Sequence, residues 1–506
     1  MPNLSRLLAH HARYRGDFPA LTFEDQTLNF DLFDKSVNRL ANALLQTGLK
    51  KGDRFATVMP NCIELMVAYW AAAASGLVIV PCSSLLQPAG LTTLLNDSGA
   101  KLALLSADQV PGISKIITDL ENISPAGVIV NATEQVNGFT TYNTFVQQAS
   151  AAHPNKDVDG DDVYNIMYSS GTTGLPKGII HSHRVRSMYC TLFANAWRMT
   201  PESVVLHAGA IVFNGAMLDL MPWMFLGCHY IMHPRFIAER VIEDIYKYKV
   251  SHIVMVPAQI IAILKSPAFS PEKLQSLEML HNVGAPLPVS YKKQINQQLP
   301  DRFYELYGVT EGFMTILDRT EAVTKEGSVG KPAAFNEIII LDDNGNPCEV
   351  DAIGEICGDG PLVMQGYHNQ PELTRKAFHG RWLRSGDLGF LDSDGYLFLV
   401  DRKKDMIISG GVNVYPKDIE EIVIEHPAVS EVAVFGVEDE KWGEVPIAAV
   451  TVDCEVDALI LQQWINQRVS AKYQRVAKVL ILDDFPRNVA GKILKRALSD
   501  SAQSAE

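Results

Sequence analysis

The sequence predicts an α/β protein in which a large N-terminal domain precedes a small C-terminal one. Helical stretches alternate with short apolar strands over residues 28–130 and again over residues 204–280, the pattern of right-handed βαβ units and parallel sheets. Two hairpin-like segments follow, and a new helix–strand–helix pattern begins after residue 401. We therefore expect two α/β subdomains and a β-rich hairpin module in residues 1–401, and a small mobile α+β domain in residues 402–506.

The individual elements follow from the period of the apolar residues. In the first α/β region we expect helices over residues 30–49 and 63–74, and strands over residues 54–59, 77–82 and 101–106. In the second we expect strands over residues 204–209, 229–233, 251–257 and 277–284, and a helix over residues 236–249.

Residues 65–96 carry no charge, and a stretch of this length could cross a bilayer. Pro81 and Pro88 would break a spanning helix, and Ser83, Ser84 and Thr92 are polar. We therefore expect a buried helix, a turn and a buried strand here, and no integral membrane segment.

The hairpin module is predicted from two turn dipeptides. Residues 337–350 contain Asn344-Gly345, and residues 389–400 contain Asp394-Gly395, each close to apolar runs. Asn-Gly and Asp-Gly favour the tight turns that join antiparallel strands.

Composition excludes several functional classes. The 44 basic and 58 acidic residues give a net charge of -14, which disfavours non-specific nucleic-acid binding. Seven scattered cysteines without a C-x-x-C pair indicate a reducing compartment and no structural zinc. The first residues lack the apolar block of a signal peptide, so we expect a cytoplasmic protein. The oligomeric state stays open, a homodimer included.

The segment YSSGTTGLPKG, residues 168–178, lies between two apolar runs and carries three glycines and a lysine. Glycines allow a tight turn whose backbone N–H groups face an anion, while hydroxyls and Lys177 add donors and positive charge. Pro176 and Gly178 stand where a Walker A loop needs Gly and Ser or Thr. The segment therefore predicts a different kind of phosphate loop; the alternative is a polar surface turn.

This segment resembles the phosphate loop of the adenylate-forming superfamily, which contains acyl-CoA and aryl-CoA synthetases, peptide-synthetase adenylation domains and luciferase. Further motifs follow in the order of that superfamily and cover nearly the whole chain. They are YELYGVTE at 304–311, GEI at 354–356, WLRSGD at 382–387, DR at 401–402, ISGGVNVYP at 408–416 and PRNVAGK at 486–492.

The resemblance implies that a carboxylic acid and ATP form an acyl-adenylate, which CoA then converts to a thioester. Glu311 would be the Mg²⁺ ligand, a hard carboxylate for a hard cation, although an exposed helix-start carboxylate is the alternative. Thr310 would share catalysis with Glu311 and Lys492. The positions implied for ATP or AMP are Ser169, Ser170, Gly171, Thr172, Thr173, Lys177, Gly284, Ala285, Glu305, Tyr307, Asp387 and Arg402.

Two of these nucleotide positions have ordinary structural alternatives. Asp387 would accept the ribose hydroxyls, as acidic residues do in other nucleotide folds, and Arg402 would be a second ribose and phosphate contact. A plain turn aspartate explains Asp387 as well. Gly284 and Ala285 would lie against the adenine, whereas tight strand packing also favours small residues.

The C-terminal domain would serve both half-reactions by rotating. The resemblance implies that Lys492 stabilises the charge that moves during adenylation. After rotation about a hinge at Lys404, Gly410 and Gly411 would guide the pantetheine thiol of CoA. The alternatives are a solvated surface lysine and a solvated basic linker.

The acid pocket departs from the family pattern. The segment over residues 207–227 aligns with one that usually carries Pro-x-x-His, but here Ala210 and Phe213 occupy those positions. Asn214 could bind a hydroxyl of the substrate or a backbone group. Met217, Gly308 and Val309 complete the pocket that the resemblance implies, and the nearby apolar side chains favour an aryl or fatty acid or are simply core.

Two alternative activities remain open at this point. One passes the acyl group to a carrier-protein thiol, although GGVNVYP and DEKWGEVPIAAV are more similar to CoA ligases. The other is a nucleotide-binding sensor without catalysis, against which the intact Lys177, Glu311, Asp387, Arg402 and Lys492 argue.

Overall fold

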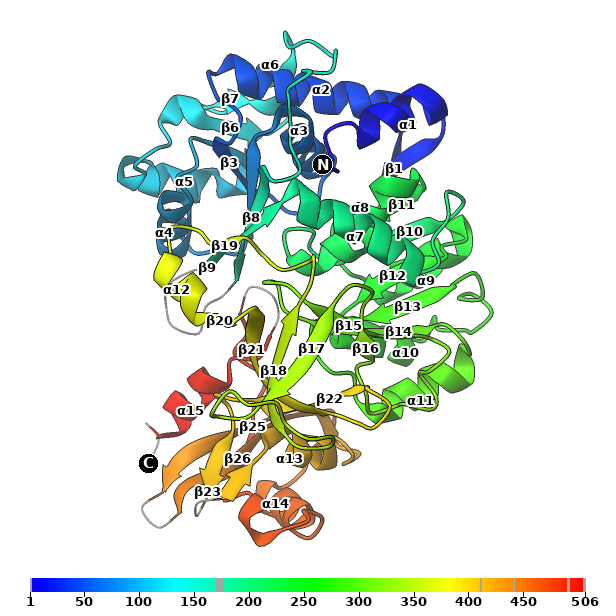
Figure 1. Ribbon diagram of the computed structural model, residues 1–506, viewed down its shortest axis with the longest axis vertical. Coiled ribbons are helices and arrows are strands. Elements are labelled where there is room, and N and C mark those ends of the chain that lie inside the picture. The colour runs from blue at the N-terminus through cyan, green and yellow to red at the C-terminus, as the bar shows by residue number, and fades with distance from the viewer. Residues whose placement is uncertain (1, 170–176, 410–411, 440–441, 489–491, 504–506) are drawn as a thin grey trace. The chain divides into compact units, whose positions relative to one another are not determined.

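The computed structural model describes residues 2–169, 177–409, 412–439, 442–488 and 492–503. The chain forms two compact units: unit 1 comprises residues 1–337 and 358–383, and unit 2 comprises residues 338–357 and 384–506. Figure 1 labels their helices and strands. The predicted α/β class, with a large N-terminal part and a small C-terminal part, is confirmed.

One sheet of unit 1 has the strand order β19-β9-β8-β4-β3-β5-β6-β7. Strands β3 to β8 run parallel, whereas β9 and β19 add antiparallel pairs at one edge. The strands are β3 (Arg54–Val58), β4 (Val78–Cys82), β5 (Leu102–Ser106), β6 (Val128–Asn131), β7 (Thr140–Thr141), β8 (Val163–Ser169), β9 (Lys177–Ser182) and β19 (Gly366–Tyr367). The helices between them are α3 (Ile63–Ser75), α4 (Pro88–Ser98), α5 (Val110–Ile116) and α6 (Tyr142–Val146).

The second sheet of unit 1 has the order β16-β15-β14-β13-β12-β10-β11-β1-β2. Its central pairs are parallel, and β2, β15 and β16 extend it with antiparallel pairs. The strands are β1 (Pro19–Phe23), β2 (Gln26–Asn29), β10 (Val204–His207), β11 (His229–Met232), β12 (His252–Met255), β13 (Met279–Asn282), β14 (Phe303–Gly308), β15 (Met314–Leu317) and β16 (Lys331–Pro332).

The remaining helices of unit 1 flank these sheets (Figure 1). They are α1 (Leu7–Arg15), α2 (Phe30–Gln46), α7 (His183–Ala196), α8 (Met217–Leu226), α9 (Ala238–Tyr248), α10 (Pro257–Lys265), α11 (Val289–Gln298) and α12 (Pro371–Lys376). Helix α2 starts at an Asn29 cap whose side chain accepts a hydrogen bond from the Leu32 N–H, and its apolar stripe packs on α3. The predicted helices and strands of both α/β regions are therefore confirmed.

The uncharged stretch forms the buried helix α3 and the buried strand β4, as predicted. Gly76 ends α3 in the left-handed conformation, and its φ of 71° suits a residue without a side chain. Trp70 of α3 packs edge-to-face on Trp223 of α8, at 6.1 Å between ring centroids. In the described part of the chain no helix combines the length and the apolar character that crossing a membrane requires.

Unit 2 begins with the strands of the predicted hairpin module. Strand β17 (Glu337–Leu341) neighbours β18 (Gly354–Asp359), and β18 neighbours β21 (Trp382–Leu391), which pairs with β22 (Leu397–Arg402). The β21–β22 hairpin around Gly395 is confirmed. The Asn344-Gly345 turn also forms, but among the described residues it joins segments that share a single β-bridge, Leu341 to Pro347. The Asp342 N–H donates to the Asn346 carbonyl and the Cys348 N–H donates to the Ile340 carbonyl, each at 2.9 Å, on either side of this bridge. In unit 1 the short β20 (Phe378–His379) pairs with the start of β21.

The rest of unit 2 is a small sheet with helices. Its strand order is β24-β23-β26-β25, with β27 parallel to β26. The elements are β23 (Ile407–Ser409), β24 (Val412–Val414), α13 (Pro416–Val423), β25 (Val429–Asp439), β26 (Gly443–Val452), α14 (Ala458–Asn466), β27 (Lys478–Ile481) and α15 (Lys495–Gln503). Ile407, Ile419 and Val434 share a core there with Leu461 of α14. The predicted α+β character of this region is confirmed.

Candidate active site

The loop that carries Glu311 joins β14 to β15 in unit 1, and two glycines shape it. A Cβ on Gly308 would lie 2.7 Å from Cγ of Met314, and one on Gly312 would lie 2.9 Å from Cα of Val363. Neither position has room for a larger side chain. Two backbone carbonyls of the loop are also held, because Thr310 accepts from His181 Nε2 at 2.9 Å and Glu311 accepts from the Met364 N–H at 2.7 Å.

The Glu311 carboxylate is half-buried and has a tyrosine partner. The Tyr367 hydroxyl donates to Glu311 Oε1 at 2.8 Å, and burial together with Glu311 raises the pKa of Tyr367. Lys177 Nζ stands 5.4 Å from the centroid of the Tyr367 ring, within cation–π range. The Tyr367 side chain thus contacts both Glu311, the predicted metal ligand, and Lys177, the predicted phosphate-binding lysine.

The predicted phosphate loop connects the antiparallel strands β8 and β9. Tyr168 pairs with Gly178, and Ser169 pairs with Lys177. The two strands therefore bring both ends of the loop together, and Lys177 stands at its base. Ser170, Gly171, Thr172 and Thr173 lie outside the described residues.

Glu305 is buried in β14, and its carboxylate is occupied by neighbouring residues. It forms an ion pair with the buried Lys292 of α11, and its Oε1 accepts from Asn282 Nδ2 at 2.8 Å. Asn282 Nδ2 also donates to the Ala285 carbonyl at 3.0 Å. Gly284 between them is exposed with a φ of 90°. Glu305 thereby supports the segment that carries Gly284 and Ala285.

The predicted acid-pocket residues start the segment that leads into α8. Phe213 and Asn214 are half-buried, and Met217 is buried. Asn214 Nδ2 donates to the Tyr189 hydroxyl at 3.5 Å. A Cβ on Gly215 would lie 3.9 Å from Val283, which places the segment next to Gly284. Tyr307, Val309 and Thr310 are half-buried at the end of β14, and Gly308 is exposed.

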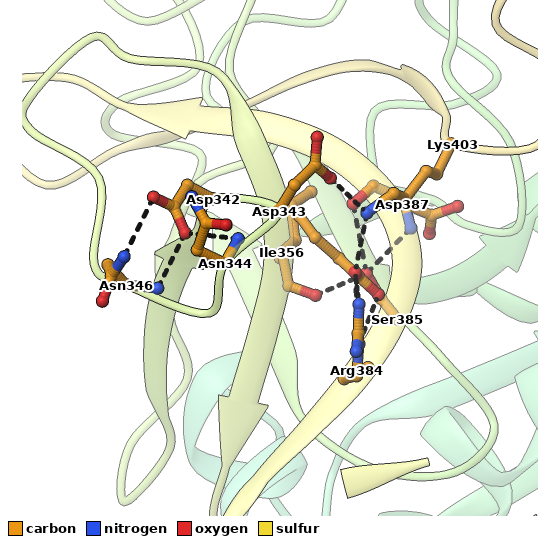
Figure 2. Close-up of polar contacts among 10 residues, drawn as sticks. Asp342, Asp343, Asn344, Asn346, Ile356, Arg384, Ser385, Asp387 and Lys403 are labelled. Carbon is orange, nitrogen blue, oxygen red and sulfur yellow. Dashed lines mark hydrogen bonds and ion pairs between the residues drawn. The ribbon is translucent and has the colours of Figure 1, made fainter. Parts of the chain in front are cut away.

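In unit 2, Asp387 stands on β21 opposite Arg402 on β22. Arg402 Nε lies 3.5 Å from Asp387 Oδ1. The Ser385 hydroxyl donates to the Ile356 carbonyl of β18 at 2.6 Å and accepts from the Asp387 N–H at 3.0 Å, as Figure 2 shows. These bonds hold the turn that presents Asp387.

A set of charged residues surrounds that turn. Arg384 Nε lies 3.2 Å from both carboxylate oxygens of Glu355, and Lys403 Nζ donates to Asp343 Oδ1 at 2.8 Å. Burial opposes ionisation of Glu355, but Arg384 and Lys403 outweigh it and lower the pKa of that carboxyl. Asp343 follows Asp342, whose Oδ1 accepts from the Asn344 and Asn346 N–H groups (Figure 2). Arg384, which precedes Asp387 on β21, is thus bonded to Glu355 of β18. Lys403, which follows Arg402, is bonded to the Asp343 turn.

Lys492 belongs to the same part of unit 2. Its N–H donates to Asn488 Oδ1 at 2.9 Å, and its carbonyl accepts from the Asn488 N–H at 2.9 Å. The Lys492 side chain is exposed in part, but the protein atoms around it displace water from the ammonium group. This desolvation lowers the pKa of Lys492. Arg402 and Lys404 lower that pKa further, while Asp387 opposes them. Burial, together with Arg402, also lowers the pKa of Lys404. Gly410 and Gly411 lie outside the described residues.

Residues 8–368 match the family model of the AMP-binding enzyme, and residues 418–492 match that of the AMP-binding enzyme C-terminal domain. The chain belongs to the AMP-binding enzyme family. The two matches together span most of the chain, and they include Lys177, Glu311 and Lys492.

This AMP-binding enzyme is similar to curated acid–CoA ligases along its whole length. It is 33% identical to a long-chain-fatty-acid–CoA ligase of Mycobacterium tuberculosis, with 94% of this chain and 93% of the relative covered. It is 31% identical to the 2-succinylbenzoate–CoA ligase of Bacillus subtilis, with 95% of each chain covered. It is also 31% identical to a feruloyl-CoA synthase of an Amycolatopsis species, with 97% and 96% covered.

Solved structures agree with these relatives. The structure of o-succinylbenzoate CoA synthetase from Bacillus subtilis with its acyl-adenylate intermediate has a TM-score of 0.87 and 29% identity, and covers 99% of this chain and 98% of that one. ATP-bound MatB from Rhodopseudomonas palustris has a TM-score of 0.89 and 27% identity, with 99% of both chains covered. The chain is an AMP-forming acid–thiol ligase.

Several residues with evident roles in this AMP-binding enzyme escaped the sequence reasoning. Tyr367 holds Glu311, yet 56 positions separate the two residues in the chain. Lys292 and Asn282 hold Glu305, and His181 holds Thr310. The one signal in the sequence was a polar residue directly after an apolar run, as with His181 after Ile179 and Ile180.

Proposed function

We propose that Lys177, Glu311, Asp387, Arg402 and Lys492 carry out the two half-reactions of this ligase. In the first, a carboxylate oxygen attacks the α-phosphorus of ATP, the bond to the β-phosphate breaks, and acyl-AMP and pyrophosphate form. In the second, the thiol of CoA attacks the acyl carbon, loses its proton, and AMP leaves. The observation that carries the assignment is the Glu311–Tyr367 hydrogen bond beside Lys177.

Glu311 suits a magnesium ion by its chemistry and by its setting. It is a half-buried carboxylate held by a neutral hydroxyl, so its negative charge is not cancelled by the hydrogen bond. When bound, Mg²⁺ neutralises the phosphate oxygens on which charge accumulates. The fixed Thr310 and Glu311 carbonyls keep the carboxylate in place.

The phosphate loop and the β13–α11 segment would hold the nucleotide. Donors from Ser169, Ser170, Gly171, Thr172 and Thr173, together with Lys177, would bind the ATP phosphates. Gly284 and Ala285, exposed and held through Asn282, would lie against the adenine, with Tyr307 beside it. Glu305 would act by positioning this segment, because its carboxylate is bonded within the protein.

In unit 2, Asp387 would accept the ribose hydroxyls and Arg402 would contact ribose and phosphate. Lys492 would stabilise charge on the α-phosphate and the attacking carboxylate during adenylation. Its closeness to Asp387 and Arg402 within the same unit supports a shared role in that step.

We place a domain border at residue 401, with residues 1–401 as the adenylation domain and a hinge at Lys404. The two family matches, which end at residue 368 and begin at residue 418, lie on either side of this border. Lys404 lies inside compact unit 2, so the proposed rotation would divide that unit. After it, Gly410 and Gly411 would guide the CoA thiol.

For the acid we propose an aryl or fatty chain against Phe213, Asn214, Met217, Gly308 and Val309. Apolar Phe213 and Met217 support this class, as do relatives named for a long-chain fatty acid, 2-succinylbenzoate and ferulate. Phe213 would close the pocket without a titratable ring.

A screen of carboxylic acids tests this proposal. The purified protein, ATP and Mg²⁺ are incubated with each acid, pyrophosphate release is measured, and CoA or a loaded carrier protein is then added as acceptor. We expect pyrophosphate with a subset of acids and thioester with CoA. Thioester on the carrier protein alone would contradict the CoA assignment, and absence of pyrophosphate with every acid would contradict adenylation.

A further inference from the structure

Arg186 of α7 is completely buried in unit 1, with 0% of its surface exposed. Charged side chains are almost never fully buried without a partner of opposite charge, because the loss of hydration is costly. None of the ion pairs found within the described residues includes Arg186, and no carboxylate is among the groups that shift its pKa. The fold therefore keeps a positive charge inside unit 1 without an internal counter-ion.

Three contacts fix the orientation of the guanidinium group. Its Nε donates to Asn165 Oδ1 at 2.9 Å, its Nη2 donates to His181 Nδ1 at 3.1 Å, and it lies 4.8 Å from the centroid of the Tyr189 ring. Its remaining nitrogen, Nη1, is buried and makes no hydrogen bond of good geometry among the described residues. The adjacent Asn165 Nδ2 is in the same state. Two neighbouring buried donors thus lack a well-placed acceptor. Burial lowers the pKa of Arg186, and an interaction with the neutral Tyr189 hydroxyl opposes that shift without supplying a negative charge.

His181 cannot supply the missing charge. Arginine only donates hydrogen bonds, so Nδ1 of His181 must accept, and its Nε2 must carry the proton donated to the Thr310 carbonyl. The imidazole is therefore neutral. Burial, with Arg186, lowers the pKa of His181 well below its usual value. A ligand must provide the anion if the charge is to be neutralised.

Two of the residues that contact Arg186 are themselves bonded to predicted site residues. On one side it stacks on Tyr189, whose hydroxyl is bonded to Asn214 in the acid-pocket segment. On the other side a single imidazole ring links it to the Thr310 carbonyl, next to Glu311. One bonded residue therefore links Arg186 to the acid-pocket segment, and one links it to the backbone beside Glu311.

We propose that Arg186 binds a second carboxylate of the acid, so that the enzyme activates a dicarboxylic acid with a short chain or a single ring between its acid groups. This inference rests on the proposed function: a diacid with a ring falls within the aryl class proposed above, whereas a short aliphatic diacid would replace the fatty class. Arg186 Nη1 donates to the second carboxylate, and Asn165 Nδ2 adds a neutral donor. A monoacid of the same shape leaves the buried charge unpaired, and sites built for a polar group reject analogues without it by large factors.

The first experiment needs no variant. Aliphatic and aromatic diacids are compared with their monomethyl esters, which keep one carboxylate and nearly the same shape, and kcat/KM for pyrophosphate release is measured with the wild-type protein. We expect the preferred diacid to exceed its ester by at least about a hundredfold. Equal or better use of the esters, or activation of monoacids only, would overturn this inference and leave the proposed function standing. Activation of no acid at all would overturn both.

The second experiment tests whether Arg186 is responsible for the preference for diacids over monoacids. In Arg186→Met the diacid preference should disappear, mainly through loss with the diacid, while Arg186→Lys should restore part of it. Arg184→Met is the matched control, because Arg184 is on the same helix but exposed, in a surface pair with Asp161. An unchanged diacid preference in folded Arg186→Met would overturn the assignment. If that variant does not fold, as judged by its thermal unfolding, the wild-type comparison decides.

Discussion

The two clusters of predicted site residues are held in different ways. In unit 1, Glu311, Thr310 and Glu305 are attached to buried partners by short hydrogen bonds from Tyr367, His181 and Asn282. In unit 2, Asp387 and Arg402 stand 3.5 Å apart near the surface, and Lys492 and Lys404 add like charge beside them. The first cluster is held by hydrogen bonds, whereas the second places three cations, Arg402, Lys404 and Lys492, around the single carboxylate of Asp387.

This contrast explains how a chain of net charge -14 can bind polyanions. Burial lowers the pKa values of Lys492 and Lys404, and neighbouring cations lower them further; a bound phosphate would offset both effects. Buried polar networks, by contrast, keep their geometry without a ligand. Substitutions in unit 2 should therefore lower the rate of the reaction. Substitutions in unit 1 should lower the stability of the fold or disturb the positions of the site residues.

The largest effect is expected for Lys492→Ala. We propose that the Lys492 charge acts on the reacting phosphate, so its loss should lower acyl-adenylate formation by about a thousandfold. Thioester formation from supplied acyl-adenylate and CoA should be almost unchanged. Single-turnover assays of each half-reaction separate the two, and equal loss in both would refute the assignment of Lys492 to the first step.

The next effect should be on folding. Lys292→Met leaves the Glu305 carboxylate buried without its cation and should destabilise the protein by about 3–5 kcal/mol. Lys293→Met is the control, since Lys293 pairs with Glu326 at 3.5 Å near the surface and its loss should cost less than about 1 kcal/mol. Urea denaturation measures both, and similar losses would contradict the proposed role of the buried pair.

Tyr367→Phe removes one hydrogen bond to a carboxylate and should lower the rate of adenylation about tenfold, with a higher Mg²⁺ requirement. Tyr230→Phe removes a comparable bond to the buried Asp219 at 3.0 Å, away from Glu311. It should lower stability without changing the dependence on Mg²⁺. Titrations of activity against Mg²⁺ compare the variants, and an unchanged requirement in Tyr367→Phe would argue against Glu311 as the ligand.

The smallest effect concerns pH. The Lys492 ammonium must be charged to act, so adenylation should fall as pH rises through its lowered pKa. Lys404→Gln removes a neighbouring cation, which raises the pKa of Lys492 and should move this alkaline decline to higher pH. High salt should shrink the difference between wild type and variant. A decline that moves to lower pH in Lys404→Gln would contradict the coupling, and Lys472→Gln serves as the exposed control.

Much of the fold could be predicted because each element has a local cause. The apolar period over residues 30–49 predicted α2, and the Asp394-Gly395 turn predicted the β21–β22 hairpin. The N-terminal β1, in contrast, pairs with β11, about 210 residues away in the chain. No local pattern specifies such a partner, because pairing depends on which strand edge is free when the chain folds.

The order of motifs in the chain predicted the family and the reaction, and it supplied the residues that we propose bind the nucleotide, since each motif combines donors, charges and glycines within a few positions. The partners of those residues were decided only in three dimensions. Tyr367 donates a hydrogen bond to Glu311, Lys292 pairs with Glu305, and Arg186 is buried with no carboxylate partner in the described part of the chain. The physical reason is that a buried polar side chain loses its hydrogen bonds to water and needs a partner inside the protein. Which atoms are buried together depends on the packed structure.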